Sequence, residues 1–217
     1  MIFGKIEYLN LLPFHIFMKR FSRNSQTQKI MNYKKNVPAK INEAFIAKEV
    51  DAAFISSIKA QKYNYVNLGI IAKKEVRSVL VIPSANSKSD KESASSNILA
   101  KILKQEGEVL IGDKALKYAL QNKEYIDLAE IWNEKYNLPF VFALLCYHKD
   151  KKIYKKIEKE FLKKQYKIPY YILQKAKEQT GIETKDICNY LELISYRLDN
   201  KAKLGLKKFY QMAKRVS

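Results

Sequence analysis

The sequence of 217 residues predicts an α/β fold, because segments typical of strands alternate with segments typical of helices up to residue 149. Two observations support this prediction. Apolar runs rich in β-branched residues recur along the chain, and most of them are followed by an amphipathic helical pattern. From residue 150 the pattern is helical to Val216. The alternation favours a largely parallel sheet, in which ligands bind beyond the carboxyl ends of the strands.

The first third of the chain alternates strand and helix patterns. Residues 2–8 have the alternation of a short strand, and the helix that follows carries Pro13 in its first turn, where proline is tolerated. A second helix, over residues 37–50, is again opened by a proline. Further strands are expected at the apolar runs 51–56, 68–72 and 76–83.

A polar, serine-rich segment over residues 84–97 runs directly into a helical pattern. Its last serines therefore lie near a helix N-terminus. The next strand, "VLIGD" (109–113), ends on a glycine and a carboxylate, and a helix begins at once. A helix over 125–136 and a long apolar strand over 138–149 complete the α/β part.

Composition narrows the class of protein. Hydrophobic residues make up 47% of the chain, which predicts a globular protein, and no apolar run is long enough to cross a bilayer. The N-terminus lacks the pattern of a signal peptide, so we expect a cytoplasmic protein. Cys146 and Cys188 have no metal-ligand spacing and are expected to be buried free thiols. We expect neither metal nor cofactor, and no glycine-rich nucleotide motif is present.

The formal net charge of +19 raises the hypothesis of nucleic-acid binding. The lysines, however, are spread along the chain, and in residues 151–167 glutamates alternate with them at helical spacing. This pattern is typical of a solvated helix face. We therefore expect no nucleic-acid partner, and a positive field that favours an anionic small molecule.

Five segments together form a specific set of motifs: "GKIEYLNLLPF" (4–14), "EVDAAFIS" (49–56), "VRSVLVIP" (76–83), "VLIGDKAL" (109–116) and "YIDLAEIWNEKYNLPFVFA" (125–143). This set resembles the chorismate dehydratase family of the futalosine route to menaquinone, from near residue 4 to the end of the chain. The resemblance implies a fold like that of type II periplasmic binding proteins, with a ligand held between two α/β lobes. It implies chorismate as the substrate and a lyase activity that needs no cofactor.

By this resemblance the crossings between the lobes fall near residues 78–83 and 138–145. The predicted first lobe comprises residues 1–80 and 141–217, and the smaller second lobe comprises residues 81–140. The span between Ser78 and "VLIGD" is much shorter than in typical family members, so the second lobe should contain a reduced sheet.

Two alternatives share the fold. The 1,4-dihydroxy-6-naphthoate synthases carry a His-Glu pair about where this chain has Gly112 and Asp113, and the lack of a histidine there favours the dehydratase. The other alternative is a non-catalytic protein that binds a small anion. The sequence does not predict the oligomeric state, and we expect no membrane partner.

The resemblance also implies site residues. Tyr8, Leu9, Asn10 and Pro13 match the family motif in full, so Asn10 is the expected catalytic amide; alternatively, Asn10 only caps a helix. The expected substrate-binding residues are Ser56, Ser78, Ser93, Ser95, Ser96, Asn97 and Gly112. For the serines, the alternatives are a solvated linker with a helix cap and ordinary strand positions.

Asp113 would repel an anion, so we expect it to cap the helix that starts beside it and to orient the loop. Gly112 would let the backbone turn tightly or approach the ligand closely. Three candidate bases are weak, since His15 is expected in the core, His148 at the surface and Glu7 inside a strand. We therefore hypothesise that the enolpyruvyl carboxylate of the substrate accepts the proton.

Overall fold

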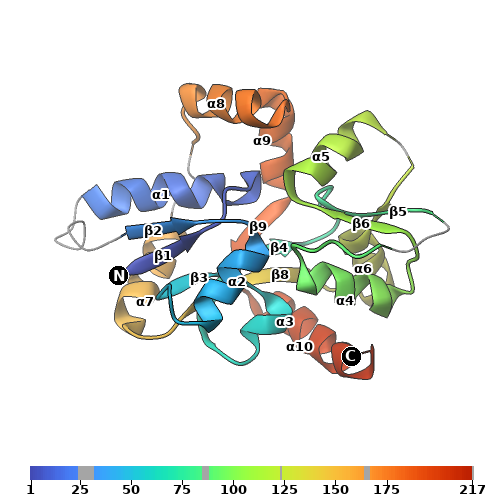
Figure 1. Ribbon diagram of the computed structural model, residues 1–217, viewed down its shortest axis with the longest axis horizontal. Helices are drawn as coiled ribbons and strands as arrows, with labels where there is room; N and C mark the ends of the chain where they lie inside the picture. The colour runs from blue at the N-terminus through green and yellow to red at the C-terminus, as the bar shows by residue number, and fades with distance from the viewer. Residues whose placement is uncertain (24–31, 85–87, 123, 164–166, 217) are drawn as a thin grey trace.

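The computed structural model describes residues 1–23, 32–84, 88–122, 124–163 and 167–216. Within these residues the chain forms two sheets, a larger one of six strands and a smaller one of three. Figure 1 shows the larger sheet with α1, α2 and α7 around it, and the smaller sheet with α4, α5 and α6 beside it. The predicted α/β class with a reduced second sheet is confirmed.

The larger sheet has the strand order β2-β1-β3-β8-β4-β9. Its strands are β1 (Ile2–Lys5), β2 (Asn32–Lys35), β3 (Ala52–Ser56), β4 (Asn64–Ala72), β8 (Phe140–Tyr147) and β9 (Ile194–Arg197). Strand β1 pairs in parallel with β2 and β3, whereas β3–β8, β4–β8 and β4–β9 are antiparallel. The expectation of a largely parallel sheet was therefore wrong.

The smaller sheet has the order β6-β5-β7, and both of its pairings are antiparallel. Its strands are β5 (Val79–Ile82), β6 (Glu108–Ile111) and β7 (Ile126–Asp127). Around it lie α4 (Ala94–Leu103), α5 (Gly112–Gln121) and α6 (Leu128–Tyr136). Asp127 is the N-cap of α6, and its Oδ1 accepts hydrogen bonds from the backbone N–H groups of Ala129 and Glu130.

The chain passes between the sheets through two short links, residues 73–78 and 137–139. Strand β4 ends at Ala72, which pairs with Phe140 at the start of β8, so both links leave the larger sheet at one place. The predicted crossings, 78–83 and 138–145, lie mostly within β5 and β8, each of which belongs to a single sheet. The residue boundaries predicted for the two lobes stay a prediction.

The remaining helices cover the larger sheet and the junction between the sheets. They are η1 (Leu9–Leu11, a 3-10 helix), α1 (Leu12–Arg23), α2 (Pro38–Ile46), α3 (Ser57–Ala60), α7 (Lys151–Phe161), α8 (Tyr170–Thr180), α9 (Thr184–Glu192) and α10 (Asn200–Val216). Helix α7 packs against α1 and β4, α8 packs against α5 and α9, and α10 packs against α4, α3 and β8. The C-terminal part is not entirely helical as expected, because β9 interrupts it.

Aromatic side chains form much of the core at both ends. In the larger sheet, the ring of Phe14 lies 4.9 Å from that of Phe54 and 5.3 Å from that of Phe161. At the junction, the ring of Phe140 lies 5.3 Å from that of Trp132 and 4.9 Å from that of Phe209. These contacts join α6, β8 and α10, so the C-terminal helix packs firmly against the smaller sheet's side of the molecule.

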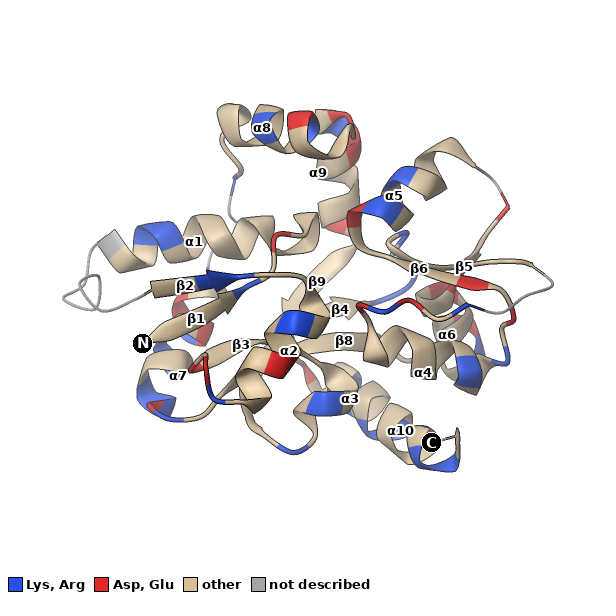
Figure 2. Ribbon diagram, in the orientation of Figure 1, with Lys and Arg blue, Asp and Glu red and all other residues tan. Residues whose placement is uncertain are grey.

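The positive charge is dispersed. Figure 2 shows Lys and Arg on most helices, with acidic residues among them. No helix among the described residues is long and apolar enough to cross a membrane. Both cysteines are free thiols, but only Cys146 is buried; Cys188 is exposed, because it lies on the outer face of the amphipathic helix α9. The expectation that both are buried was wrong for Cys188.

Candidate active site

A pocket lies between the larger and the smaller sheet. It holds about 630 Å³ of empty space including its open mouth, within the usual range for small-molecule sites. Most of its wall is apolar. The lining residues are Ile6, Tyr8, Asn10, Leu11, Pro38, Phe54, Ser56, Ile70, Val76, Ser78, Val79, Glu92, Ser93, Ser96, Ile111, Gly112, Phe142 and Ala143.

The N-termini of three helices contribute to this wall. Pro38 is the first residue of α2, Gly112 is the first residue of α5, and Ser93 is the N-cap of α4. The hydroxyl of Ser93 accepts a hydrogen bond from the backbone N–H of Ser96, 3.2 Å away. Helix N-termini carry unpaired N–H groups and the positive end of the helix dipole. Their convergence makes the pocket suitable for an anion without a lysine or arginine in its described lining.

Asn10 lines the pocket from η1 and does not cap a helix. Tyr8 occupies the N-cap position of η1, and no side chain caps it. The backbone carbonyl of Asn10 accepts a hydrogen bond from the hydroxyl of Tyr196 at 2.7 Å. Burial raises the pKa of Tyr190, and hydrogen bonds with the side chains of Ser78 and Asn10 oppose this effect. The Asn10 amide is therefore held beside Tyr190 at the pocket wall.

Ser78 lines the pocket and forms hydrogen bonds with Gly112 and Tyr190. Its backbone carbonyl accepts a hydrogen bond from the N–H of Gly112 at 2.8 Å. Its hydroxyl accepts one from the hydroxyl of Tyr190 at 2.9 Å, in a fully buried contact. Ser56 lines the pocket at the end of β3, where the side-chain amide of Asn42 donates to its hydroxyl over 3.3 Å.

Gly112 has a left-handed backbone with φ of 69°, which favours glycine. A Cβ atom at this position would lie 2.7–3.0 Å from three atoms of the Tyr8 ring. The missing side chain thus allows the ring to lie against the backbone. The backbone of Gly112 thus approaches the ring of Tyr8 closely, and its positive φ agrees with the tight turn expected from the sequence.

Asp113 does not cap α5 as expected, because it lies inside the first turn of that helix and Ile111 occupies the N-cap position. Its Oδ1 instead accepts a hydrogen bond from the N–H of Leu9, the first residue of η1, at 3.0 Å. Burial raises its pKa to about 6, while the hydrogen bond from Leu9 opposes the shift. Asp113 is absent from the described lining and supports the segment that carries Asn10.

Ser95 and Asn97 are not among the lining residues, so their predicted contact with substrate has no support from the geometry. The hydroxyl of Ser95 lies 3.0 Å from that of Ser57 and accepts a hydrogen bond from the N–H of Ile58. Asn97 binds both the N–H and the carbonyl of Asp90 through its side chain. The side chains of both residues are therefore engaged in contacts between α4 and its neighbours.

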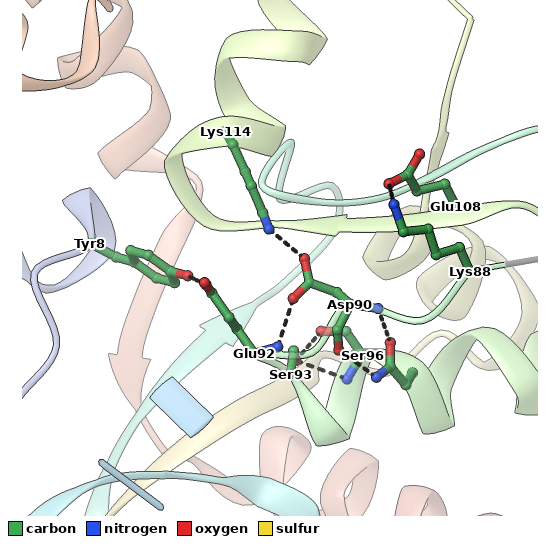
Figure 3. A network of polar contacts seen from close by, with 9 residues as sticks. Tyr8, Lys88, Asp90, Glu92, Ser93, Ser96, Glu108 and Lys114 are labelled. Atoms are coloured by element: carbon green, nitrogen blue, oxygen red, sulfur yellow. Dashed lines mark hydrogen bonds and ion pairs between the residues drawn. The ribbon is translucent and has the colours of Figure 1, made fainter. Parts of the chain in front are cut away.

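The sequence did not indicate Tyr8 or Glu92 as functional side chains. The Tyr8 hydroxyl donates a hydrogen bond to Oε2 of Glu92, and Figure 3 shows the two side chains pointing toward each other. Tyr8 follows β1 of the larger sheet, while Glu92 precedes α4 beside the smaller sheet. Burial and the neighbouring Glu92 carboxylate raise the pKa of Tyr8. Tyr8 belongs to a recognised motif, whereas no local pattern distinguishes Glu92 from a surface glutamate.

The three candidate bases lie outside the pocket lining. His15 is bonded to the carbonyl of Ile6 at 2.8 Å, and burial lowers its pKa to about 4. His148 is bonded to the carbonyl of Phe45 and stacks on its ring at 4.0 Å, so it is half-buried and not a simple surface residue. Glu7 lies beyond β1, exposed and paired with Lys5 and Lys35, and not inside the strand. The described residues contain no cluster of three or more His, Cys, Asp or Glu that could hold a metal.

The fold is that of the periplasmic binding proteins. A protein of Archaeoglobus fulgidus of known structure matches with a TM-score of 0.74 at 14% identity, covering 99% of this chain and 96% of that one. The periplasmic aliphatic sulphonate binding protein of Escherichia coli matches with a TM-score of 0.56 at 13% identity, covering 99% and 91%. At these identities the likeness shows the fold alone.

The sequence comparisons identify the family. The family model described as menaquinone biosynthesis matches residues 1–107 and 91–215. The chain is 46% identical over 221 residues to the chorismate dehydratase of Campylobacter jejuni subsp. jejuni serotype O:23/36 (strain 81-176), covering 100% of this chain and 99% of that protein. The chain belongs to the menaquinone biosynthesis family, as its motifs indicated.

Proposed function

We propose that this protein is a chorismate dehydratase, a lyase that converts chorismate to 3-[(1-carboxyvinyl)oxy]benzoate and water in menaquinone biosynthesis by way of futalosine. The main support is the 46% identity to the Campylobacter enzyme from end to end. Because the match covers 99% of that enzyme, the short second sheet is compatible with a protein named as a dehydratase. We expect the reaction in the cytoplasm, where free thiols such as Cys146 persist.

Much of the driving force for this reaction lies in the substrate. Removal of the ring proton at C3 places negative charge in the conjugated ring carboxylate, and departure of the C4 hydroxyl as water then makes the ring aromatic. The protein has to bind two carboxylates, exclude bulk water and stabilise the charge that develops. The apolar wall formed by side chains such as Ile6, Phe54 and Phe142 supports the second task.

For the two carboxylates, the pocket offers hydroxyl groups and helix N-termini. Ser93 and Ser96 lie at the start of α4, and the N-terminus of α5 lies at Gly112. Ser56 and Ser78 add hydroxyls from the side of the larger sheet and from the first link. These are neutral donors, which bind an anion without a formally charged partner.

Asn10 is the proposed catalytic amide. Its side chain offers both a donor and an acceptor, so it can hold the departing C4 hydroxyl or the enolpyruvyl carboxylate. Neither His15, His148 nor Glu7 lines the pocket, and Glu92, the acid in the described lining, accepts the hydrogen bond of Tyr8. We hypothesise that the enolpyruvyl carboxylate of the substrate takes the C3 proton.

The sister activity, 1,4-dihydroxy-6-naphthoate synthesis, has less support. Both histidines of the chain bond to backbone carbonyls outside the pocket lining, and Gly112 and Asp113 stand where that family carries its His-Glu pair. A non-catalytic anion-binding protein of the same fold is the other alternative. It shares the pocket but would not release the aromatic product.

The experiment incubates purified protein with chorismate and follows the ultraviolet absorbance of the aromatic product, with product identity checked by mass spectrometry. We expect stoichiometric release of 3-[(1-carboxyvinyl)oxy]benzoate, unchanged after treatment with a chelator. Tight binding of chorismate without turnover would identify the binding protein instead. Loss of activity to the chelator, restored by a divalent metal, would contradict the expectation of a metal-free reaction.

A further inference from the structure

Glu92 brings a negative charge into a pocket that is proposed to take a dianion. Among the described lining residues it is the one with a formal charge at neutral pH. A carboxylate beside two substrate carboxylates is unfavourable, because like charges at short distance repel each other. The presence of Glu92 in the pocket lining therefore requires a functional explanation.

The backbone of Glu92 is firmly held. Its N–H donates to Oδ1 of Asp90 at 2.8 Å, and Oδ2 of Asp90 pairs with Nζ of Lys114 at 2.8 Å (Figure 3). The Asp90 side chain is only 3% exposed, and Asn97 binds the Asp90 backbone on both sides. The segment before α4 is therefore fixed to α5, and its position does not depend on the Glu92 side chain.

The Glu92 carboxylate itself has one hydrogen-bond partner among the described residues, the hydroxyl of Tyr8. The ring of Tyr8 is fixed because it packs against the backbone of Gly112. The hydroxyl therefore points at a set position at the end of the Glu92 side chain, in the wall of the pocket that Ser93, the N-cap of α4, also lines. The hydroxyl thus lies in the same pocket as the start of α4, where a substrate carboxylate is expected.

We propose that the Tyr8 hydroxyl is a donor to one carboxylate of the substrate, and that in the free protein the Glu92 carboxylate occupies this donor and is exchanged for the substrate's carboxylate on binding. The proposal rests on the proposed function, and it assigns Tyr8 to binding and Glu92 to competition with the substrate. A tyrosine hydroxyl donates one hydrogen bond at a time, so the two carboxylates cannot use it together. The exchange replaces one anionic acceptor by another and leaves the donor satisfied throughout.

Single substitutions should act in opposite directions. Glu92→Gln keeps the length of the side chain and a neutral acceptor for Tyr8, but removes the charge; the KM for chorismate should fall about threefold or more with kcat nearly unchanged. Tyr8→Phe removes the donor and leaves the ring in place, so KM should rise about tenfold. Glu106→Gln, which removes an exposed charge from the loop before β6, is the matched control and should change neither constant.

The decisive measurement is Tyr8→Phe in the Glu92→Gln background. If Tyr8 binds the substrate, this second change should still raise KM about tenfold, because the lost bond is to the substrate. If Tyr8 serves only to hold Glu92, the second change should leave KM as it is in Glu92→Gln, and the proposal is wrong. Loss of kcat in Glu92→Gln with unchanged KM would also overturn it, because Glu92 would then act as a base.

Calorimetric binding of 3-[(1-carboxyvinyl)oxy]benzoate separates this inference from the proposed function. The dissociation constant should fall in Glu92→Gln and rise again in the double variant, whether or not turnover is detected. Turnover by the parent with equal product affinity in parent and Glu92→Gln overturns the exchange alone. A parent that neither turns over chorismate nor binds the product overturns both.

Discussion

Gly112→Ala is expected to lower the free energy of unfolding and to deform the pocket. At φ of 69° an alanine is strained, by roughly 1–2 kcal/mol. The new methyl group would also lie 2.7–3.0 Å from three atoms of the Tyr8 ring, and such overpacking typically costs about 1–3 kcal/mol. The two effects together predict a loss of about 2–5 kcal/mol.

Gly181→Ala is a matched control. Gly181 also has φ of 69°, at the end of α8, but a Cβ atom there would meet Nζ of Lys117 at 2.9 Å, the mobile end of a long side chain. The free energy of unfolding of Gly181→Ala should therefore fall only by the backbone strain, about 1–2 kcal/mol. The difference between the variants isolates the contact of Gly112 with the Tyr8 ring.

Denaturant unfolding and chorismate turnover should be measured on both variants. Gly112→Ala should lose most of its turnover, because the displaced ring changes the pocket wall, whereas Gly181→Ala should retain it. Tyr8→Ala in the Gly112→Ala background should restore part of the lost stability by making room for the methyl group. If Gly112→Ala unfolds like Gly181→Ala and keeps the parental rate, the close packing of Tyr8 on this backbone is not significant.

Three further predictions concern the supports of the site. Because Asn10 caps no helix, Asn10→Ala and Asn10→Ser should each lower the free energy of unfolding by less than about 1 kcal/mol, but each should lower kcat at least ~100-fold. Thermal melting and chorismate turnover test this, and a parental rate in Asn10→Ser would refute it. Burial raises the pKa of Asp113 to about 6 from 3.8, so its neutral form stabilises the fold below about pH 4, and this contribution is lost as the pH rises through 6. Relative to Asp113→Asn, the free energy of unfolding of the parent should therefore fall by about 2–3 kcal/mol over that pH range. Parallel pH profiles of the two proteins would contradict the shift. Asp127→Ala should lower the free energy of unfolding measured in urea by about 3 kcal/mol, because four backbone N–H groups lose their acceptor. Asp127→Asn should lower it less, and equal losses in the two variants would count against this.

The sequence predicted the elements that have strong local patterns. The proline at the start of α2, the apolar run of β8 and the cap Ser93 of α4 are local features, and each appears in the structure. Strand β2 was missed because its sequence "NYKK" is exposed throughout, and β9 because four residues between helices show no period. The antiparallel pairing escaped prediction because alternation does not reveal that the chain leaves the larger sheet after β4 and returns with β8.

For the site, the resemblance of the motifs to a known family predicted that Asn10, Ser78 and Gly112 share one site, and all three line the pocket. No local pattern shows that these residues would meet. The errors concern orientation and distant partners. Asp113 bonds to a residue 104 positions away, which no local reading can reveal. In the serine-rich segment the sequence identified a helix start but not which side of the helix faces the pocket, so Ser95 was included and Glu92 was overlooked.

The half-buried Asp113 and the buried Asp127 indicate how a pocket proposed for an anion can be built beside acidic residues. Asp113 accepts the N–H of Leu9 and so fixes η1, which carries Asn10, to α5. Asp127 accepts the N–H groups of Val76 and Arg77 at 2.8 and 2.6 Å, and so fixes the link that carries Ser78 to α6. Neither carboxylate belongs to the described pocket lining, and each accepts hydrogen bonds from backbone N–H groups, which offset the cost of burying it. Burial raises the pKa of both, because it disfavours the charged form of each carboxyl group. These two acids position the walls from outside the described lining, whereas Glu92 lies within it and is the carboxylate that the substrate replaces at the Tyr8 hydroxyl.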